Sequence, residues 1–337
     1  MNTSSALKSS SLLFAQLQKH VGERPDEVAF RILPNGSINE ALTWTWAELF
    51  EQTERVARVL QSKLNAGDRA LLLYDTSLDF IASYMACLGT GVIAVPVPPP
   101  DPSRPTASLE RLRGVISNAS PGIVLSSAGF VAQLPMLAAM APDIAALDWL
   151  ATDGLEAGGA DPGWHAYASD PDAVAMLQYT SGSTGHPKGV MLTQHNLAHN
   201  TEGMGVGLEL DESTRFFSWM PLFHDFGLIA VVLSSIRLGA EATLMSPLAF
   251  LQKPERWLQG ISHFKTDISC APNFAYALCV SRCSDELDVD LSHWRIAGNG
   301  AEPIQLDTLE AFLEKFEPKG FKWSAYNPMY GLAESTV

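Results

Sequence analysis

The chain has 337 residues, of which 47% are hydrophobic and 18% are charged, a composition typical of a globular protein of about two domains. Its 37 acidic residues outnumber its 22 basic ones, and the formal net charge of −15 argues against a nucleic-acid partner. Because the overall field of such a chain repels polyanions, any polyphosphate ligand must be held by local donors and local positive charge.

Four cysteines are too few for a disulfide framework, and no CxxC spacing occurs. We therefore expect buried free thiols. The less favoured alternative is a zinc site built from Cys270, Cys279, Cys283 and His263. Residues 1–20 lack the apolar run of a signal peptide, and no stretch of 18 apolar residues occurs anywhere. We expect a cytoplasmic protein without a membrane span.

The first half of the chain alternates between helical and strand-like patterns of apolar residues. Helices are predicted over 45–64, 77–88 and 109–116. Strands are predicted over 69–74, 92–97 and 122–125. Ser77 is expected to cap the second helix, and the prolines of 96–105 predict an extended loop. Residues 151–172, rich in Gly, Ala, Asp and Pro, predict a surface loop.

The second half repeats this alternation. Strands are predicted over 216–220, 242–245, 267–270 and 294–298. Helices are predicted over 229–238, 250–263, 274–283 and 306–316. Short apolar strands separated by helices are typical of mainly parallel sheets covered on both faces. We therefore expect an α/β fold with two doubly wound lobes, 1–210 and 211–337.

The most informative segment, YTSGSTGHPKGV at 179–190, lies between two strand-like runs at 173–177 and 190–192. Its glycines allow the backbone to approach a ligand closely, and its hydroxyl and N–H groups can donate to phosphate oxygens. Lys188 adds the local positive charge that an acidic chain needs. The predicted phosphate-binding residues are Thr180, Ser181, Gly182, Ser183, Thr184, Gly185 and Lys188.

This segment is not one of the common nucleotide loops. Pro187 stands where the GxxxxGK[ST] pattern requires glycine, and Gly189 stands where that pattern requires Ser or Thr. A strand rather than a helix is expected next, which excludes the GxGxxG fingerprint. An ordinary Ser/Gly surface loop, the remaining alternative, does not explain a Pro-Lys-Gly end that leads directly into a hydrophobic strand.

The segment resembles the phosphate-binding loop of the adenylate-forming superfamily: acyl- and aryl-CoA synthetases, peptide-synthetase adenylation domains, luciferases and fatty acyl-AMP ligases. The resemblance extends over nearly the whole chain. It implies the fold of the N-terminal domain of these enzymes, and it implies ATP and Mg²⁺ as cofactors.

The sequence WMPLFHDFGL at 219–228 resembles the motif at the mouth of the family's carboxylate-substrate pocket. The resemblance implies a catalytic His224, and it implies substrate contacts from His224, Asp225, Phe226 and Gly227. Amino-acid-activating relatives usually place an aspartate directly after the phenylalanine. Here His224 intervenes, which argues against an amino-acid substrate. The alternative is that His224 only caps a helix.

Two further motifs resemble the family's adenine and metal sites. The turn GNGAEP at 298–303, expected to open a helix with Pro303 in its first turn, implies adenine contacts from Gly300, Ala301 and Glu302. A simple strand-to-helix turn would use the same glycines. In NPMYGLAEST at 327–336, the resemblance implies cofactor contacts from Tyr330, Gly331 and Leu332, and a magnesium ligand in Glu334. Ala333 replaces a threonine that contacts the α-phosphate in many members, so Ser335 or Thr336 would take over that contact.

The alanine before Glu334 and the proline-rich 95–100 resemble the fatty acyl-AMP ligase branch. The implied reaction joins a fatty acid to the AMP of ATP and releases pyrophosphate. The acyl group would then pass to an acyl carrier protein of a lipid, polyketide or nonribosomal peptide pathway. The alternatives are an acyl-CoA synthetase, which uses CoA as the acceptor, and a non-catalytic acyl-nucleotide binding module. Because family members continue with a barrel and a mobile C-terminal domain, we expect this chain to be an N-terminal part that turns over poorly alone.

Overall fold

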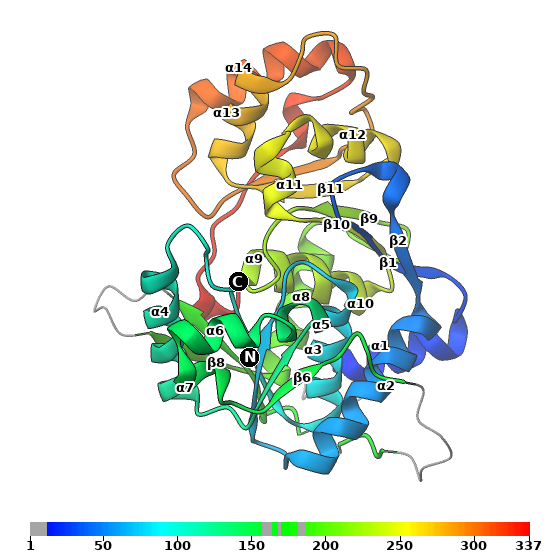
Figure 1. The fold of residues 1–337 in the computed structure, drawn as a ribbon. Helices are drawn as coiled ribbons and strands as arrows, with labels where there is room; N and C mark the ends of the chain where they lie inside the picture. Colours follow the sequence, from blue (N-terminus) through cyan, green and yellow to red (C-terminus); the bar gives the residue numbers. More distant parts are fainter. Residues whose placement is uncertain (1–11, 157–163, 168–169, 181–186) are drawn as a thin grey trace. The chain divides into compact units, whose positions relative to one another are not determined.

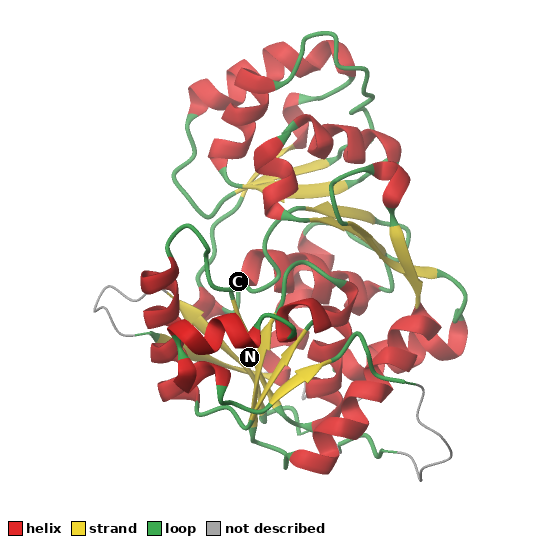
Figure 2. Ribbon diagram, in the orientation of Figure 1, coloured by secondary structure: helices red, strands yellow, loops and turns green. Residues whose placement is uncertain are grey.

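The computed structural model describes residues 12–156, 164–167, 170–180 and 187–337. The chain forms two compact units, the first comprising Met1–Asp26 and Trp46–Asn200, the second Glu27–Thr45 and Thr201–Val337. Each unit is built on one sheet that carries helices (Figures 1 and 2). None of the described helices is both long enough and apolar enough to span a bilayer.

The first unit holds a six-stranded sheet in the order β6-β5-β3-β4-β7-β8. Its strands are β3 (Arg69–Leu73), β4 (Ile93–Val97), β5 (Ile123–Ser126), β6 (Trp149–Ala151), β7 (Val174–Thr180) and β8 (Lys188–Thr193). All pairs are parallel except β7 and β8, which form an antiparallel hairpin. The helices begun in this unit are α1 (Leu13–Glu23), α2 (Trp46–Lys63), α3 (Leu78–Thr90), α4 (Pro105–Ala119), α5 (Ala128–Val131), α6 (Leu134–Met140), α7 (Pro142–Ala145) and α8 (Gln194–Gly207).

The second unit holds a seven-stranded sheet in the order β13-β12-β11-β9-β10-β1-β2. Its strands are β1 (Val28–Leu33), β2 (Leu42–Thr45), β9 (Arg215–Ser218), β10 (Glu241–Met245), β11 (Ile268–Ala271), β12 (Ile296–Asn299) and β13 (Tyr326–Pro328). Only the β1–β2 pair is antiparallel. The helical segments are η2 (Ile38–Glu40), α9 (Asp225–Gly227), η3 (Leu228–Leu233), α10 (Ser234–Leu238), α11 (Pro247–Gln252), α12 (Glu255–His263), α13 (Asn273–Arg282), α14 (Leu306–Phe316), η4 (Glu317–Lys319), η5 (Trp323–Ala325) and η6 (Ala333–Ser335).

The expected α/β fold with two mainly parallel, helix-covered sheets is confirmed. Most of its helices and strands are predicted by local sequence features such as helix caps and apolar periodicity. Ser77 caps α3, because its side chain accepts a hydrogen bond from Phe80 N at 3.2 Å. The helix ends at Gly91, whose φ of +74° is a left-handed conformation that glycine adopts without strain. Almost every residue of α3 is buried, as expected for a helix inside a doubly wound unit.

Three details differ from the sequence-based expectation. Pro105 begins α4 instead of ending the proline loop, since a proline at the first helical position gives up no hydrogen bond. The single helix expected over 250–263 is two helices, α11 and α12, separated at Pro254, whose ring disfavours continuation of a helix. Residues 27–45, expected in the first lobe, belong to the sheet of the second unit.

The placement of 27–45 follows from strand pairing. β1 lies parallel to β10, with Phe30 opposite Ala242 and Ile32 opposite Leu244. Phe30, Ile32 and Leu33 are buried, so β1 is covered by the core of the second unit. Nothing local in such an apolar run indicates which sheet will receive it, because any covered parallel strand has the same pattern.

Candidate active site

The predicted phosphate loop is carried by the hairpin of β7 and β8. Thr180 ends β7 and lies opposite Lys188, the first residue of β8. Lys188 is exposed, so its ammonium group is accessible to a ligand. Ser181, Gly182, Ser183, Thr184 and Gly185 lie outside the described residues. The structure thus brings Thr180 and Lys188 together at the end of the hairpin where the predicted loop connects the two strands.

The motifs of the second unit follow the carboxyl ends of its parallel strands. His224 comes after β9, the turn at 300–302 comes directly after β12, and Tyr330 comes after β13. In open α/β sheets ligands bind at the carboxyl ends of the strands. The topology therefore gathers these three predicted contacts at the edge of the sheet where a ligand is expected.

His224 caps the helical segment that begins with α9. Its Nδ1 lies 3.2 Å from Phe226 N and 2.7 Å from Asp225 Oδ1. Nδ1 can accept from Phe226 N only without a proton and can donate to Asp225 only with one, so the two contacts belong to different protonation forms. Either form leaves Nε2 unused by these contacts, and the side chain is 47% exposed. The capping role left open by the sequence is therefore present, and it does not prevent the ring from reaching a ligand.

Phe226 and Gly227 are buried at the start of the same segment. A Cβ on Gly227 would lie 2.3 Å from the carbonyl oxygen of Pro221 and 2.9 Å from that of Met220. The glycine is needed because the helix packs directly on this backbone turn. The next segment, η3 (Leu228–Leu233), has π-helical geometry, which is rare and frequently found at functional sites.

We predict that Gly227→Ala lowers the free energy of unfolding by about 1–3 kcal/mol, because the methyl group overlaps a backbone oxygen that cannot move away cheaply. Urea denaturation of the variant measures the change. Gly203→Ala is the matched control: it lies in helix α8 with no atom within 4 Å of its added Cβ, so it should be neutral or slightly stabilising. Equal stability of the two variants would contradict the prediction.

The predicted adenine turn is shaped by close packing and by a helix cap. A Cβ on Gly300 would lie 2.6 Å from the carbonyl oxygen of Met329, and Ala301 has a left-handed φ of +64°. Strained backbone of this kind is frequent at ligand sites. Glu302 Oε1 accepts a hydrogen bond of 2.6 Å from Phe274 N at the start of α13. Pro303 does not open a helix, since α14 begins only at Leu306.

The last motif is open to solvent. Tyr330 is 88% exposed, and Leu332 is 47% exposed. Gly331 lies between them, and Glu334 is exposed in the short η6. An exposed aromatic face can stack on a base, and an exposed carboxylate suits Mg²⁺, which typically takes one or two protein carboxylates together with phosphates. Glu334 therefore fits the role of a magnesium ligand. Ala333 is buried and has no hydroxyl, so position 333 provides no side-chain hydrogen-bond donor for a phosphate.

No group of three His, Cys, Asp or Glu side chains within the described ranges could hold a metal by itself. All four cysteines are buried and unpaired. Burial raises the pKa of the Cys270 thiol to about 12, which keeps it protonated.

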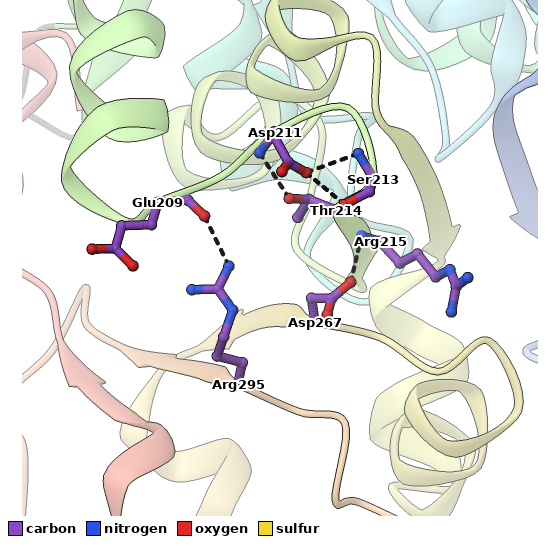
Figure 3. A pocket seen from close by; sticks show the side chains of 7 residues that line it. All are labelled: Glu209, Asp211, Ser213, Thr214, Arg215, Asp267 and Arg295. Carbon is purple, nitrogen blue, oxygen red and sulfur yellow. Dashed lines mark hydrogen bonds between the residues drawn. The ribbon is translucent and has the colours of Figure 1, made fainter.

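A polar pocket of about 440 Å³ lies at the amino ends of the strands of the second unit (Figure 3). Its lining residues are Glu209, Asp211, Ser213, Thr214, Arg215, Asp267 and Arg295. Arg295 donates to the carbonyl oxygens of Leu208 and Glu209, both at 3.1 Å, beyond the end of α8. Asp267 Oδ2 accepts from Arg215 N at 2.9 Å. These groups bind one another at the edge of the sheet opposite to the predicted contacts, so the pocket is not part of the candidate site.

Comparison with known proteins agrees with this geometry. Residues 17–337 match the family model described as AMP-binding enzyme. The chain is 38% identical to a medium-chain-fatty-acid–[acyl-carrier-protein] ligase of Moorena producens, covering 92% of this chain and 52% of that protein. It is 34% identical to a long-chain-fatty-acid–AMP ligase of Mycolicibacterium smegmatis, covering 97% and 53%.

Solved structures give the same result. The chain is 35% identical to a fatty acid AMP ligase from Legionella pneumophila, with a TM-score of 0.90, covering 98% of this chain and 57% of that one. A fatty acyl-adenylate ligase from L. pneumophila, solved with acyl adenylate and pyrophosphate, has a TM-score of 0.88 at 35% identity, covering 97% and 57%. The chain spans about half the length of the curated relatives it matches. It belongs to the AMP-binding enzyme family, as an adenylate-forming enzyme related to fatty acyl-AMP ligases and fatty acid–acyl carrier protein ligases.

Proposed function

We propose that this protein activates a fatty acid as a fatty acyl-AMP ligase. A carboxylate oxygen of the fatty acid attacks the α-phosphorus of ATP. The bond between that phosphorus and the oxygen that bridges the α- and β-phosphates breaks, so that acyl-AMP forms and pyrophosphate leaves. The observation that carries the proposal is the exposed Lys188, which lies opposite Thr180 at the loop end of a hairpin, in a chain 38% identical to a fatty acid–acyl carrier protein ligase.

The residues have distinct roles in this proposal. Lys188 neutralises part of the phosphate charge, the N–H and hydroxyl donors of 180–185 hydrogen-bond to the phosphate oxygens, and Tyr330 stacks on the adenine. His224 orients the carboxylate through its free Nε2. Glu334 would hold Mg²⁺, which supplies further charge neutralisation when bound. Such reactions depend mainly on positioning and electrostatic stabilisation, so no covalent intermediate with the protein is needed.

The acceptor we propose is the phosphopantetheine thiol of an acyl carrier protein. The support is that two of the relatives, 38% and 31% identical, are named as ligases of fatty acids to an acyl carrier protein. The thiol attacks the acyl carbon of the adenylate and AMP leaves. CoA is the alternative acceptor, since relatives 33% identical are named as putative fatty acid–CoA ligases.

Trapping with hydroxylamine tests the activation step. The protein in its full-length form is incubated with ATP, Mg²⁺ and fatty acids of short, medium and long chain, and acyl hydroxamate and pyrophosphate are measured. We expect both products in equal amounts, and only when ATP and fatty acid are present together. ATP binding without any hydroxamate would contradict the proposal and favour a non-catalytic binding module. Supplying either holo acyl carrier protein or CoA then identifies the acceptor.

A further inference from the structure

Helix α4 packs against both strands that flank the predicted phosphate loop. Its apolar side chains, Leu112, Val115 and Ala119, lie in one buried cluster with Tyr179 of β7. The helix also contacts β8. One helix therefore contacts both the strand that precedes the predicted loop and the strand that follows it.

The entering strand is attached to α4 by a hydrogen bond. The hydroxyl of Tyr179, a residue only 7% exposed, donates to Asn118 Oδ1 at 2.5 Å. The ring of Tyr179 also covers Gly189 on the opposite strand, since a Cβ there would lie 3.0 Å from Tyr179 Cζ. Tyr179 and Gly189 lie opposite each other in the strand register. Tyr179 therefore contacts the neighbouring strand through its ring and α4 through its hydroxyl.

Pro187, at the end of the predicted loop, packs directly against the backbone of α4 at Gly114. A Cβ on Gly114 would lie 2.9 Å from Cγ and 3.0 Å from Cδ of Pro187. The proline ring thus fits only because position 114 has no side chain. Gly114 and Asn118 are four residues apart and lie on the same face of α4.

We propose that Gly114 and Asn118 are positioning residues of the nucleotide site: α4 holds Tyr179 and Pro187, so that their chain neighbours Thr180 and Lys188 are positioned before ATP binds. This inference rests on the proposed function. Because Tyr179 and Pro187 are already held against α4 in the folded protein, less conformational entropy is lost when ATP binds. The affinity for the triphosphate is therefore higher. The affinity for the fatty acid does not depend on these contacts.

Asn118→Leu tests the hydrogen bond, because leucine has a similar size and no acceptor. We expect the KM for ATP and its dissociation constant to rise about three- to tenfold, the range that one lost hydrogen bond gives. The KM for the fatty acid should stay unchanged. Asn118→Asp keeps the acceptor and should restore ATP affinity. Tyr179→Phe should match Asn118→Leu, and the double variant should lose no more than either single one, since both remove the same contact.

Gly114→Val tests the second attachment independently by displacing Pro187, and a rise in the KM for ATP of at least tenfold is expected. Glu110→Gln, at an exposed position of the same helix, is the control that should leave both KM values unchanged. Thermal melting confirms that each variant is folded.

The outcomes separate the inference from the proposed function. Unchanged ATP affinity in folded Asn118→Leu and Gly114→Val would overturn the inference alone. An equal loss of affinity for ATP and fatty acid, in step with stability, would also overturn it, because that is the effect of general packing. Failure of the unaltered protein to bind ATP at all would overturn the proposed function together with this inference.

Discussion

Replacing Lys188 with alanine is expected to lower the rate of acyl-adenylate formation about 10²–10³-fold, the typical loss when one preorganised group that stabilises transition-state charge is removed. Lys188 places a positive charge at the loop end of the β7–β8 hairpin. The chain as a whole carries a net charge of −15, so its overall field opposes the approach of ATP. A local ammonium group is then worth more than it would be in a neutral protein.

Hydroxamate formation at saturating ATP measures this change. Lys188→Arg should retain part of the activity, because it keeps the charge while changing its geometry. Lys19→Ala is the control: Lys19 is exposed on α1, where it pairs with Glu23, and its replacement should leave the rate unaltered. A loss of less than about tenfold in Lys188→Ala would contradict the role assigned to this lysine.

Replacing Trp257 with alanine is expected to lower the free energy of unfolding of the second unit by about 3–5 kcal/mol. The side chain is fully buried, and its ring centroid lies 5.2 Å from that of Trp294 and 5.5 Å from that of Tyr276. Its Nε1 donates to Ser269 Oγ at 2.8 Å, and that hydroxyl donates to the carbonyl oxygen of Phe217 at 2.7 Å. The variant therefore creates a large cavity and removes a buried hydrogen bond together.

Urea denaturation followed by circular dichroism measures the loss. Trp323→Ala is the matched control, because the side chain of Trp323 is 49% exposed and its truncation leaves no buried cavity. The control should lose about 1 kcal/mol or less. Similar losses in the two variants would mean that the aromatic cluster around Trp257 does not form the core of this unit.

The part of the site that could be predicted from the sequence consists of contiguous motifs. The glycines, hydroxyls and lysine of 180–189 carry their chemistry within ten neighbouring positions, and the motifs at 224–227 and 330–334 are equally compact. A resemblance to a known family can be recognised in such short contiguous segments from the sequence alone. The structure adds that all the strands before the motifs of the second unit end at the same edge of the sheet.

The contacts that the sequence did not indicate join residues far apart in the chain. Glu302 caps α13 through Phe274, 28 positions away, and Tyr179 binds Asn118, 61 positions away. The pocket at the amino ends of the strands likewise unites residues from 209 to 295. No local pattern reports such pairs, since either partner alone is an ordinary polar side chain.

The sequence by itself determined most of the local elements, and the predicted chemistry of the motifs rests on it. Helix α3 is an example, because its cap at Ser77, its apolar interior and its end at Gly91 are all properties of one short segment. Tertiary structure alone decided that β1, besides pairing with its chain neighbour β2, joins the distant strand β10 and not the sheet of the first unit. It also decided that α4 borders the predicted phosphate loop. The physical reason is that caps and periodicity act over one or two helical turns, whereas the partner of a buried apolar strand is selected by packing of the whole core.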